Sequence, residues 1–206
     1  SLAATLPNAV TTECDVSEDA HIERTFRYLG DKLGPINFVV HSIAYANRED
    51  LGGAFSATSR EGFRIALETS AYSLMAVSRL ATPFMANGGS ILTMTFQASE
   101  RVFPGYNIMG TAKAALENEV MQLAAELGEK NIRVNAISAG PLETLAARGV
   151  KGFSGMKHMM EERTPLRRNI THEEVAKTAL FLCSDLSSGI TGAIIPVDAG
   201  FRIMAV

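Results

Sequence analysis

The chain has 206 residues, of which 47% are hydrophobic and 20% charged, and its formal net charge at pH 7 is -3. This balance is typical of globular proteins and excludes the disordered and fibrous classes. The 19 Lys and Arg residues are scattered without a basic block, which argues against a nucleic-acid partner. A chain of this length buries roughly 70% of the surface that it exposes when unfolded, so it needs no disulfide or metal to fold.

The sequence contains neither a membrane span nor a metal-binding motif. Its longest uncharged stretch, residues 80–99, is interrupted by Pro83, Gly88 and Gly89. The first residues have no basic leader followed by an apolar run, so we expect no secretory signal and a cytoplasmic location. The two cysteines, Cys14 and Cys183, are too few for a zinc site, and no CxxC or HExxH occurs. We therefore expect no metal and no membrane contact.

Strands and helices are predicted to alternate along the chain. Apolar runs rich in β-branched residues predict strands, and steps of three and four between apolar residues predict helices. In chain order we expect a strand at 9–14, a helix at 18–33, a strand at 36–41, a helical stripe from Phe63 to Phe84, a strand at 90–95, a helix at 106–127, and strands at 132–137 and 193–197 separated by a helix at 173–184. Thr171 and Glu174 predict a capping box for that last helix.

This alternation predicts an α/β fold with an open, doubly wound parallel sheet, Rossmann-like in architecture. The chain shows no linker or repeat, so we expect one domain over residues 1–206. The stretch 145–164 combines three glycines with a methionine-rich run and is predicted to be a mobile flap.

Open parallel sheets bind ligands at the carboxyl ends of their strands, so the residues that follow each strand are site candidates. They fall in four segments: Asp15-Val16, 42–47, 96–100 and 138–141. For any one of these segments, an ordinary βα loop without a binding role explains the small and polar residues about equally well.

Tyr106 and Lys113 form the sharpest pair of candidate catalytic residues. Seven residues of helix turn by about 700°, which would bring both side chains to one face, two turns apart. An ammonium near a phenol lowers the tyrosine pKa and also donates hydrogen bonds to sugar hydroxyls. The pair is therefore predicted to donate a proton or stabilise an oxyanion, although a surface tyrosine and a solvated lysine would show the same spacing.

The sequence also resembles a known protein family. The runs ERVFPGYNIMGTAKAALENEV, NIRVNAISAGPLETLAARGVKGF and ERTPLRRN, together with HSIAYAN and SDLSSGITG, closely resemble the bacterial NADH-dependent enoyl-[acyl-carrier-protein] reductases of the short-chain dehydrogenase/reductase superfamily. The likeness extends from Asp15 to the end of the chain. It implies hydride transfer from NADH to a trans-2-enoyl thioester on acyl-carrier protein, in type II fatty acid synthesis.

The resemblance also implies roles for individual residues. Tyr106 would hydrogen-bond the thioester carbonyl, and Lys113 would hold the nicotinamide ribose. The other cofactor contacts would be Asp15, Val16, Ser42, Ile43, Leu142, Glu143, Thr144, Leu145 and Ala146. The substrate contacts would be Ala46, Phe96, Met109, Phe153 and Met156, the last two on the flap. A homotetramer is the expected assembly.

Two departures from the family pattern stand out. Phe96 occupies a position where many members have a second active-site tyrosine, which we interpret as a variation of the substrate pocket. The chain also lacks the family's opening strand, glycine-rich turn, helix and second strand, and no G-x-G-x-x-G occurs in it. The fold is thus expected to be truncated at its N-terminus by about two strands and a helix, with a gap beside the strand at 36–41 and weak NADH binding by these 206 residues alone.

The sequence is also compatible with two other functions. The first is a carbonyl reductase of the same superfamily, which is disfavoured because Gly110 and Thr93 stand where such enzymes usually have lysine and serine. The second is a catalytically incompetent fragment that serves only in binding or assembly, which the missing glycine-rich turn would favour.

Overall fold

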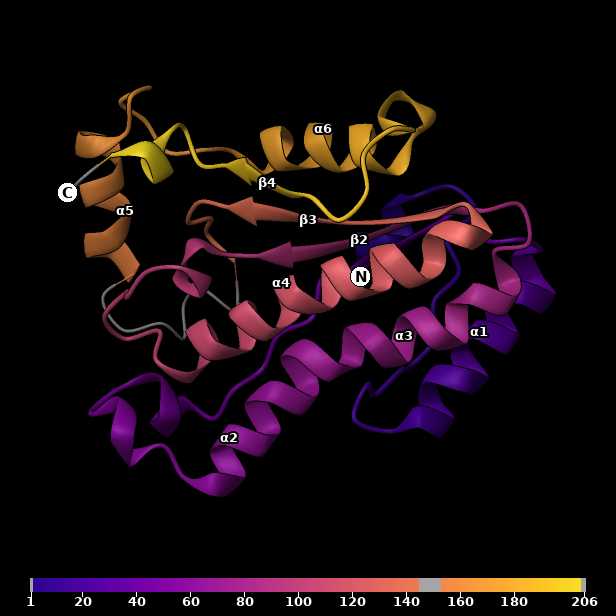
Figure 1. The fold of residues 1–206 in the computed structure, drawn as a ribbon, viewed down its shortest axis with the longest axis horizontal. Helices are drawn as coiled ribbons and strands as arrows, with labels where there is room; N and C mark the ends of the chain where they lie inside the picture. Colours follow the sequence, from indigo (N-terminus) through magenta and orange to yellow (C-terminus); the bar gives the residue numbers. More distant parts are fainter. Residues whose placement is uncertain (1, 145–152, 205–206) are drawn as a thin grey trace.

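A computed structural model describes residues 2–144 and 153–204 and contains one parallel sheet. Its four strands are β1 (Phe38–His41), β2 (Gly89–Thr95), β3 (Ile132–Ala139) and β4 (Ile194–Val197), in the spatial order β1-β2-β3-β4. Every neighbouring pair of strands is parallel, so the carboxyl ends of all four strands lie at the same end of the sheet (Figure 1). This confirms the predicted parallel α/β architecture and four of the five predicted strands.

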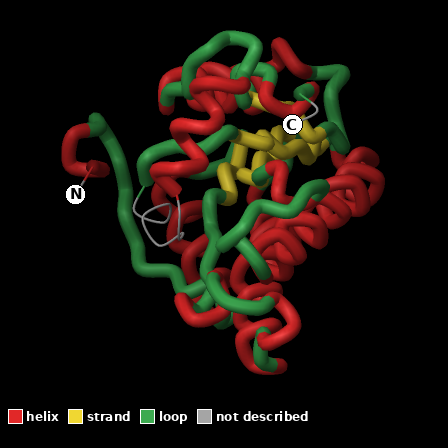
Figure 2. The backbone as a smooth tube through the Cα atoms, turned by 90° about the vertical axis from the view of Figure 1, so that its left-hand side faces the viewer, coloured by secondary structure: helices red, strands yellow, loops and turns green. Residues whose placement is uncertain are grey.

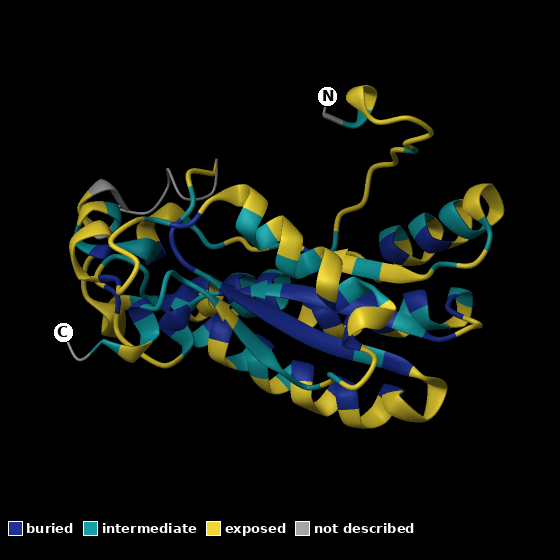
Figure 3. Ribbon diagram, turned by 90° about the horizontal axis from the view of Figure 1, so that it is seen from above, coloured by how far each residue is buried: buried dark blue, intermediate teal, exposed yellow. Residues whose placement is uncertain are grey.

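The prediction of a strand at residues 9–14 is wrong. These residues have no regular structure and, apart from the half-buried Val10, are exposed. In Figure 3 the segment stands away from the body of the molecule and leads to the short helical turn η1 (Leu2–Thr5). An isolated β-prone segment gains nothing from extending unless a neighbouring strand accepts its backbone hydrogen bonds. No strand of the described chain lies beside it.

Six α-helices and several short helical turns surround the sheet within the described residues. The helices are α1 (Asp19–Leu33), α2 (Arg60–Leu67), α3 (Ser73–Ala81), α4 (Ile108–Leu127), α5 (Phe153–Arg163) and α6 (His172–Cys183). The predicted capping box is confirmed, because the Thr171 side chain accepts from the Glu174 backbone while the Glu174 carboxylate accepts from Thr171 N. The expected flap lies partly outside the described residues, which resume in α5.

The helices form a layer on each face of the sheet, as the tube in Figure 2 and the ribbon in Figure 1 show together. Helices α1, α3 and α4 cover one face, where Ile22, Leu74, Ile91 and Leu116 are completely buried. Helix α6 covers the other face and packs Leu182 against the strands. Two separate apolar layers thus fix the sheet between them.

The predicted stripe from Phe63 to Phe84 is only partly buried. Leu74, Val77 and Ala81 are in the core, but Phe63 is 45% exposed. A π-helical turn, η4 (Glu68–Tyr72), separates α2 from α3 and adds residues to one turn of the run. Because this turn changes the helical phase, α2 buries Gly62 and Ala66 instead of Phe63.

Strand β1 forms an open edge of the sheet. It pairs only with β2 among the described strands, and its Phe38 and Val40 side chains are 53% and 46% exposed. The edge lies where the topology expected from the sequence places two further strands.

The described residues give no sign of a membrane span or a metal centre. Every helix within residues 2–144 and 153–204 is too short or too polar to cross a bilayer. The same residues contain no group of three His, Cys, Asp or Glu side chains arranged to hold a metal ion.

The turn before β2 gives a test of the packing. Gly88 has φ +76°, and a Cβ there would lie 2.5 Å from the Asn131 carbonyl oxygen, whereas Gly128 has helical backbone angles and open space around it. Gly88→Ala is expected to lower the free energy of unfolding by roughly 1–3 kcal/mol. The matched Gly128→Ala is expected to raise it by about 0.4–1 kcal/mol. Urea unfolding measures both values, and equal stability of the two variants would contradict the described turn.

Candidate active site

Lys113 lies buried beneath the carboxyl end of β2. Its side chain is on α4, the residue is 5% exposed, and its Nζ donates a 2.8 Å hydrogen bond to the carbonyl oxygen of Met94. Removal from water lowers the lysine pKa to about 8, against a smaller opposing effect of Glu117. An ammonium has three donors, and the Met94 carbonyl takes one of them, so the group can still donate to a ligand.

Tyr106 lies at the same end of β2 but not on the helix. Helix α4 begins at Ile108, and Asn107 between them has φ +36°, so the predicted helix from residue 106 starts two residues too early. The geometric argument from helical spacing is therefore wrong for Tyr106. Its ring instead meets Phe96, directly beyond β2, with ring centroids 5.1 Å apart in an edge-on arrangement. Tyr106 and Lys113 thus both contact the segment where β2 ends.

The predicted lowering of the Tyr106 pKa is also wrong for the protein as described. Burial raises this pKa to about 12, and no effect of Lys113 accompanies it. The phenol is therefore protonated at neutral pH. It can donate a hydrogen bond but carries no negative charge of its own.

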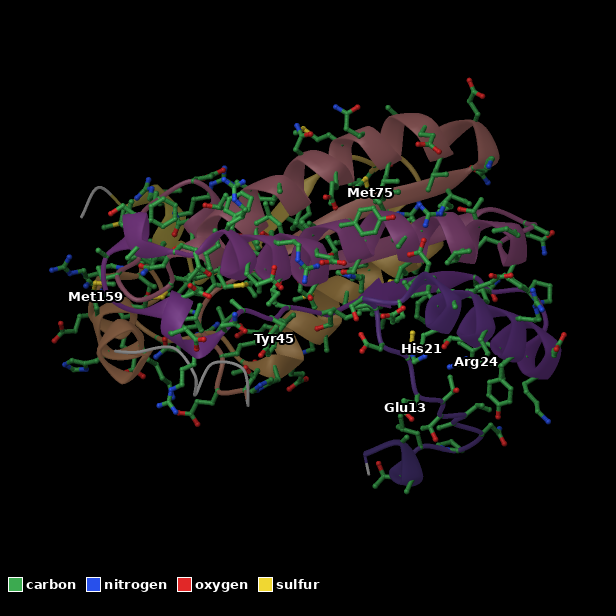
Figure 4. The ribbon with its side chains drawn as sticks, turned by 90° about the horizontal axis from the view of Figure 1, so that it is seen from below. Glu13, His21, Arg24, Tyr45, Met75 and Met159 are labelled. Carbon is green, nitrogen blue, oxygen red and sulfur yellow. The ribbon has the colours of Figure 1, made fainter. Side chains whose placement is uncertain are left out.

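An aromatic and sulfur-rich cluster forms the wall behind Tyr106. Phe96 lies 4.7 Å from Phe103, and Phe103 lies 6.4 Å from Phe201. Met159 and Met160 of α5 pack into the same cluster, and Figure 4 labels Met159 on this helix. The described part of the predicted flap, helix α5, therefore reaches the wall beside Tyr106.

The loop after β1 is held in place by one hydroxyl group. Ser70 Oγ accepts from Tyr45 N and donates to Tyr45 O, both at 2.9 Å, which fixes the loop that carries Ser42, Ile43 and Ala46. Ser42 is exposed, whereas Ile43 and Ala46 are half-buried. The loop is positioned by the interior and leaves Ser42 open to a ligand.

The remaining predicted site residues are distributed unevenly. Met109 is 5% exposed, and its Sδ lies 3.7 Å from Ser70 Oγ, so it belongs to the interior beside the site. Asp15 lies on the segment before α1 and accepts from Ser17 N and Oγ, while Val16 packs against the core. Leu142 is half-buried, Thr144 is exposed, and Glu143 pairs with Lys157 of α5 at 2.7 Å. Leu145 and Ala146, and the side chains of Phe153 and Met156, lie outside the described structure.

A polar network beneath the site was not predicted as a unit. His41 is 2% exposed and makes hydrogen bonds to Thr93 and Ser73. Glu117, which accepts from Thr95 at 2.7 Å, was not singled out. Its position four residues after Lys113, on the same side of the helix, was the available signal.

A pocket opens beside this network, at the carboxyl ends of β2, β3 and β4. Its lining includes Phe96, Gln97, Glu117, Ser138, Gly140 and Met160. Gln97 is 7% exposed, and its Nε2 has no hydrogen-bond partner. The site thus combines an apolar wall with a few polar groups, as ligand sites commonly do.

The hydrogen bonds of His41 predict its tautomer. Burial, with a smaller effect of the Lys113 charge, lowers the pKa of His41 to about 4, so the ring is neutral and has one N–H. Ser73 Oγ donates its one proton to Thr69 O at 2.6 Å and must therefore accept from His41 Nε2–H. His41 Nδ1 then accepts from the Thr93 hydroxyl, whose other possible acceptor, the carbonyl oxygen of His41, is farther away at 3.2 Å.

We therefore expect the Nε2–H tautomer of His41 in ¹H–¹⁵N spectra, unchanged between pH 8 and 5. Because the folded-state pKa lies below the ordinary 6.5, the unfolded chain binds more protons between these values. The stability from this group is thus complete above about pH 6.5 and is lost as the pH falls toward 4. Protonation of His41 with a midpoint above 6 would contradict the arrangement.

Comparisons with known proteins agree with one another. The profile of the family described as "Enoyl-(Acyl carrier protein) reductase" matches residues 1–202. The chain is 52% identical to an enoyl-[acyl-carrier-protein] reductase [NADH] of Nostoc over 93% of its own length and 74% of that protein. It is 51% identical to the [NADPH] enzyme of Staphylococcus aureus, over 95% of the chain and 77% of that enzyme.

A solved structure gives the same result for the fold. The structure of the Bacillus cereus enoyl-acyl carrier protein reductase, determined with NADP+ and indole naphthyridinone, superposes with a TM-score of 0.97 at 49% identity. The superposition covers 100% of this chain and 80% of that one.

Proposed function

The chain belongs to the enoyl-(acyl carrier protein) reductase family, and from this membership we propose that it reduces a trans-2-enoyl thioester on acyl-carrier protein with NADH, in fatty acid synthesis. The observation that carries the proposal is the placement of Tyr106 and Lys113 at one end of β2, beside an apolar wall. Residues 1–206 would act as one Rossmann-like unit, and the cytoplasm is the compartment that we predict.

Tyr106 would bind the thioester carbonyl. Its phenol remains protonated because burial raises its pKa to about 12, so it can donate a hydrogen bond to the carbonyl oxygen. When hydride adds to the β-carbon, negative charge develops on that oxygen, and a preorganised donor in a dry site stabilises it. The Phe96 ring holds the phenol in place from one side.

Lys113 fits the ribose of a nicotinamide cofactor. Its ammonium is fixed by Met94 O and keeps further donors for vicinal hydroxyls. When bound, the reduced nicotinamide supplies the hydride. Ser42 and Ile43 after β1, and Leu142, Glu143, Thr144, Leu145 and Ala146 after β3, would surround the cofactor, with Asp15 and Val16 toward its adenine. Either NADH or NADPH satisfies the contacts of the nicotinamide half, and relatives of both kinds occur.

The enoyl chain would lie against the aromatic and methionine side chains. Phe96 and Ala46 would form its walls, and the resemblance adds Phe153 and Met156 as further contacts. Met109 would support this wall from the interior, because only 5% of it is exposed. Apolar side chains of this kind suit an acyl tail, and flexible methionines adapt to its length.

The carbonyl-reductase alternative is disfavoured by the packing of α4. A Cβ on Gly110 would lie 2.8 Å from the Ala98 carbonyl oxygen, which leaves no room for a lysine four residues after Tyr106. The Thr93 side chain is fully buried and engaged with His41, so its hydroxyl does not face a substrate. The chain therefore lacks both the lysine and the serine that the carbonyl-reductase pattern has at positions 110 and 93.

The reaction is tested on the complete protein by the loss of NADH absorbance with a crotonyl thioester. Tyr106→Phe is expected to lower kcat about 10²- to 10³-fold with little change in the KM for NADH, because it removes a donor to the developing oxyanion. Tyr28→Phe, on α1, is the matched control and should retain full activity. No turnover by the wild type would favour the incompetent fragment, and an active Tyr106→Phe would refute the role of the phenol.

We also propose that the intact protein is a homotetramer. The face formed by α2, α3 and α4 exposes Phe63, Tyr72, Met75 and Met121, between 37% and 50% each. Figure 4 views this side of the molecule and labels Met75 on it. Apolar side chains gathered on neighbouring helices favour an isologous contact with a second copy.

Met75→Glu is expected to shift the complete protein toward smaller species in analytical ultracentrifugation, because it places a charge in an apolar contact. Leu33→Glu, at the exposed end of α1, is the control and should leave the mass unchanged. An unaltered tetramer in Met75→Glu would exclude this face from the assembly.

A further inference from the structure

The Lys113 ammonium has a carboxylate neighbour that the proposed reaction does not use. Glu117 lies four residues after Lys113 on α4, so the two side chains leave the same side of the helix. Lys113 binds the carbonyl of Met94, and Glu117 binds the hydroxyl of Thr95, the next residue of β2. Two consecutive residues at the end of one strand thus hold the two oppositely charged groups.

Thr95 fixes the Glu117 carboxylate in this position. Its Oγ1 donates to Glu117 Oε1 at 2.7 Å, and the threonine is 4% exposed. Thr95 is also paired with Ser138 of β3 in the sheet register, so its backbone is held by the sheet on one side. A carboxylate anchored to the sheet keeps its distance from the ammonium, whereas a free glutamate on a helix surface would change rotamers.

The other groups around the ammonium do not balance its charge. His41 of β1 is neutral above about pH 4, and Tyr106 is neutral below about pH 12. Within residues 2–144 and 153–204, Glu117 is the only charged group that raises the Lys113 pKa against the effect of burial. An uncompensated ammonium at 5% exposure would tend to lose its proton.

We propose that Glu117 is a positioning residue, which keeps Lys113 charged and directed at the carboxyl end of β2 through its anchor on Thr95. The proposal rests on the proposed function, in which a charged Lys113 holds the nicotinamide ribose. Glu117 touches neither substrate nor cofactor in this role. It acts through the lysine alone.

Glu119 provides an internal contrast on the same helix. It is half-buried, its Oε2 has no hydrogen-bond partner, and burial raises its pKa to about 7. It has no effect on the pKa of Lys113. A carboxylate two residues away therefore lacks both the anchor and the electrostatic coupling that Glu117 has.

The first test measures the Lys113 pKa directly, by ¹³Cε-lysine NMR on the complete protein, with the resonance assigned by its loss in Lys113→Arg. Glu117→Gln is expected to lower this pKa by about one unit, since it removes the opposite charge that raises it. Glu119→Gln should leave it unchanged. Equal Lys113 pKa values in the two variants would overturn the proposal.

The second test uses Thr95, in case Glu117→Gln fails to fold. Thr95→Val retains the shape of the side chain but removes the hydroxyl anchor, and it should lower the Lys113 pKa in the same direction by a smaller amount. Thr95→Ser retains a hydroxyl and should restore the wild-type value. If valine and serine gave the same pKa, the anchor would have no role.

The third test separates this proposal from the reaction itself. In Glu117→Gln the alkaline limb of the pH profile for NADH binding should move down by about one unit, because the neutral amine appears at lower pH. Binding at pH 6 should stay within about twofold of the wild type. A loss that is uniform at all pH values would indicate mere structural damage and overturn the proposal. The NMR titration needs no turnover, so an inactive wild type would refute the proposed function without affecting this result.

Discussion

A buried positive charge at the end of β2 is the constraint on which the rest of the site depends. The interior does not solvate an ammonium, so Lys113 needs a carbonyl acceptor, a nearby carboxylate and neutral neighbours at once. Met94 O, Glu117 and the uncharged His41 supply these three conditions. The remaining donors of the ammonium lie near the carboxyl end of β2, where we propose that the cofactor binds.

The polar residues of the strand ends form one layer beneath the site. On β2 the alternate residues Thr93 and Thr95 face the α3 and α4 side, where they bind His41 and Glu117 respectively. Leu92 and Met94, which alternate with them, face the opposite layer. The period of a β-strand thus places two hydroxyl anchors in a row, and each one fixes a titratable side chain next to Lys113.

The sequence was sufficient for the features that depend on local pattern. Four strands, the capping box at Thr171 and the parallel topology follow from periodicity and composition. The start of α4 was placed two residues early, because the positive φ of Asn107 leaves no periodic signal. The predicted apolar stripe included Phe63, which is exposed. Apolar spacing alone does not reveal the π-helical turn that changes the helical phase after α2. The side-chain network of His41, Thr95 and Glu117 joins residues far apart in the chain, so no single motif reveals it.

The failed strand at residues 9–14 and the open edge at β1 have one physical cause. A β-prone segment orders only where a neighbour completes its hydrogen bonds, and β1 exposes Phe38 and Val40 where a neighbour would lie. In the family's order, one further strand would pair with β1 and a second would lie between that strand and residues 9–14, which would then have a partner. Asp15 follows that segment directly, so the same pairing would bring it to the edge that carries Ser42. In the proposed site, the adenine half would therefore depend on sheet pairing, whereas the nicotinamide half would depend on contacts that the chain already makes around Lys113.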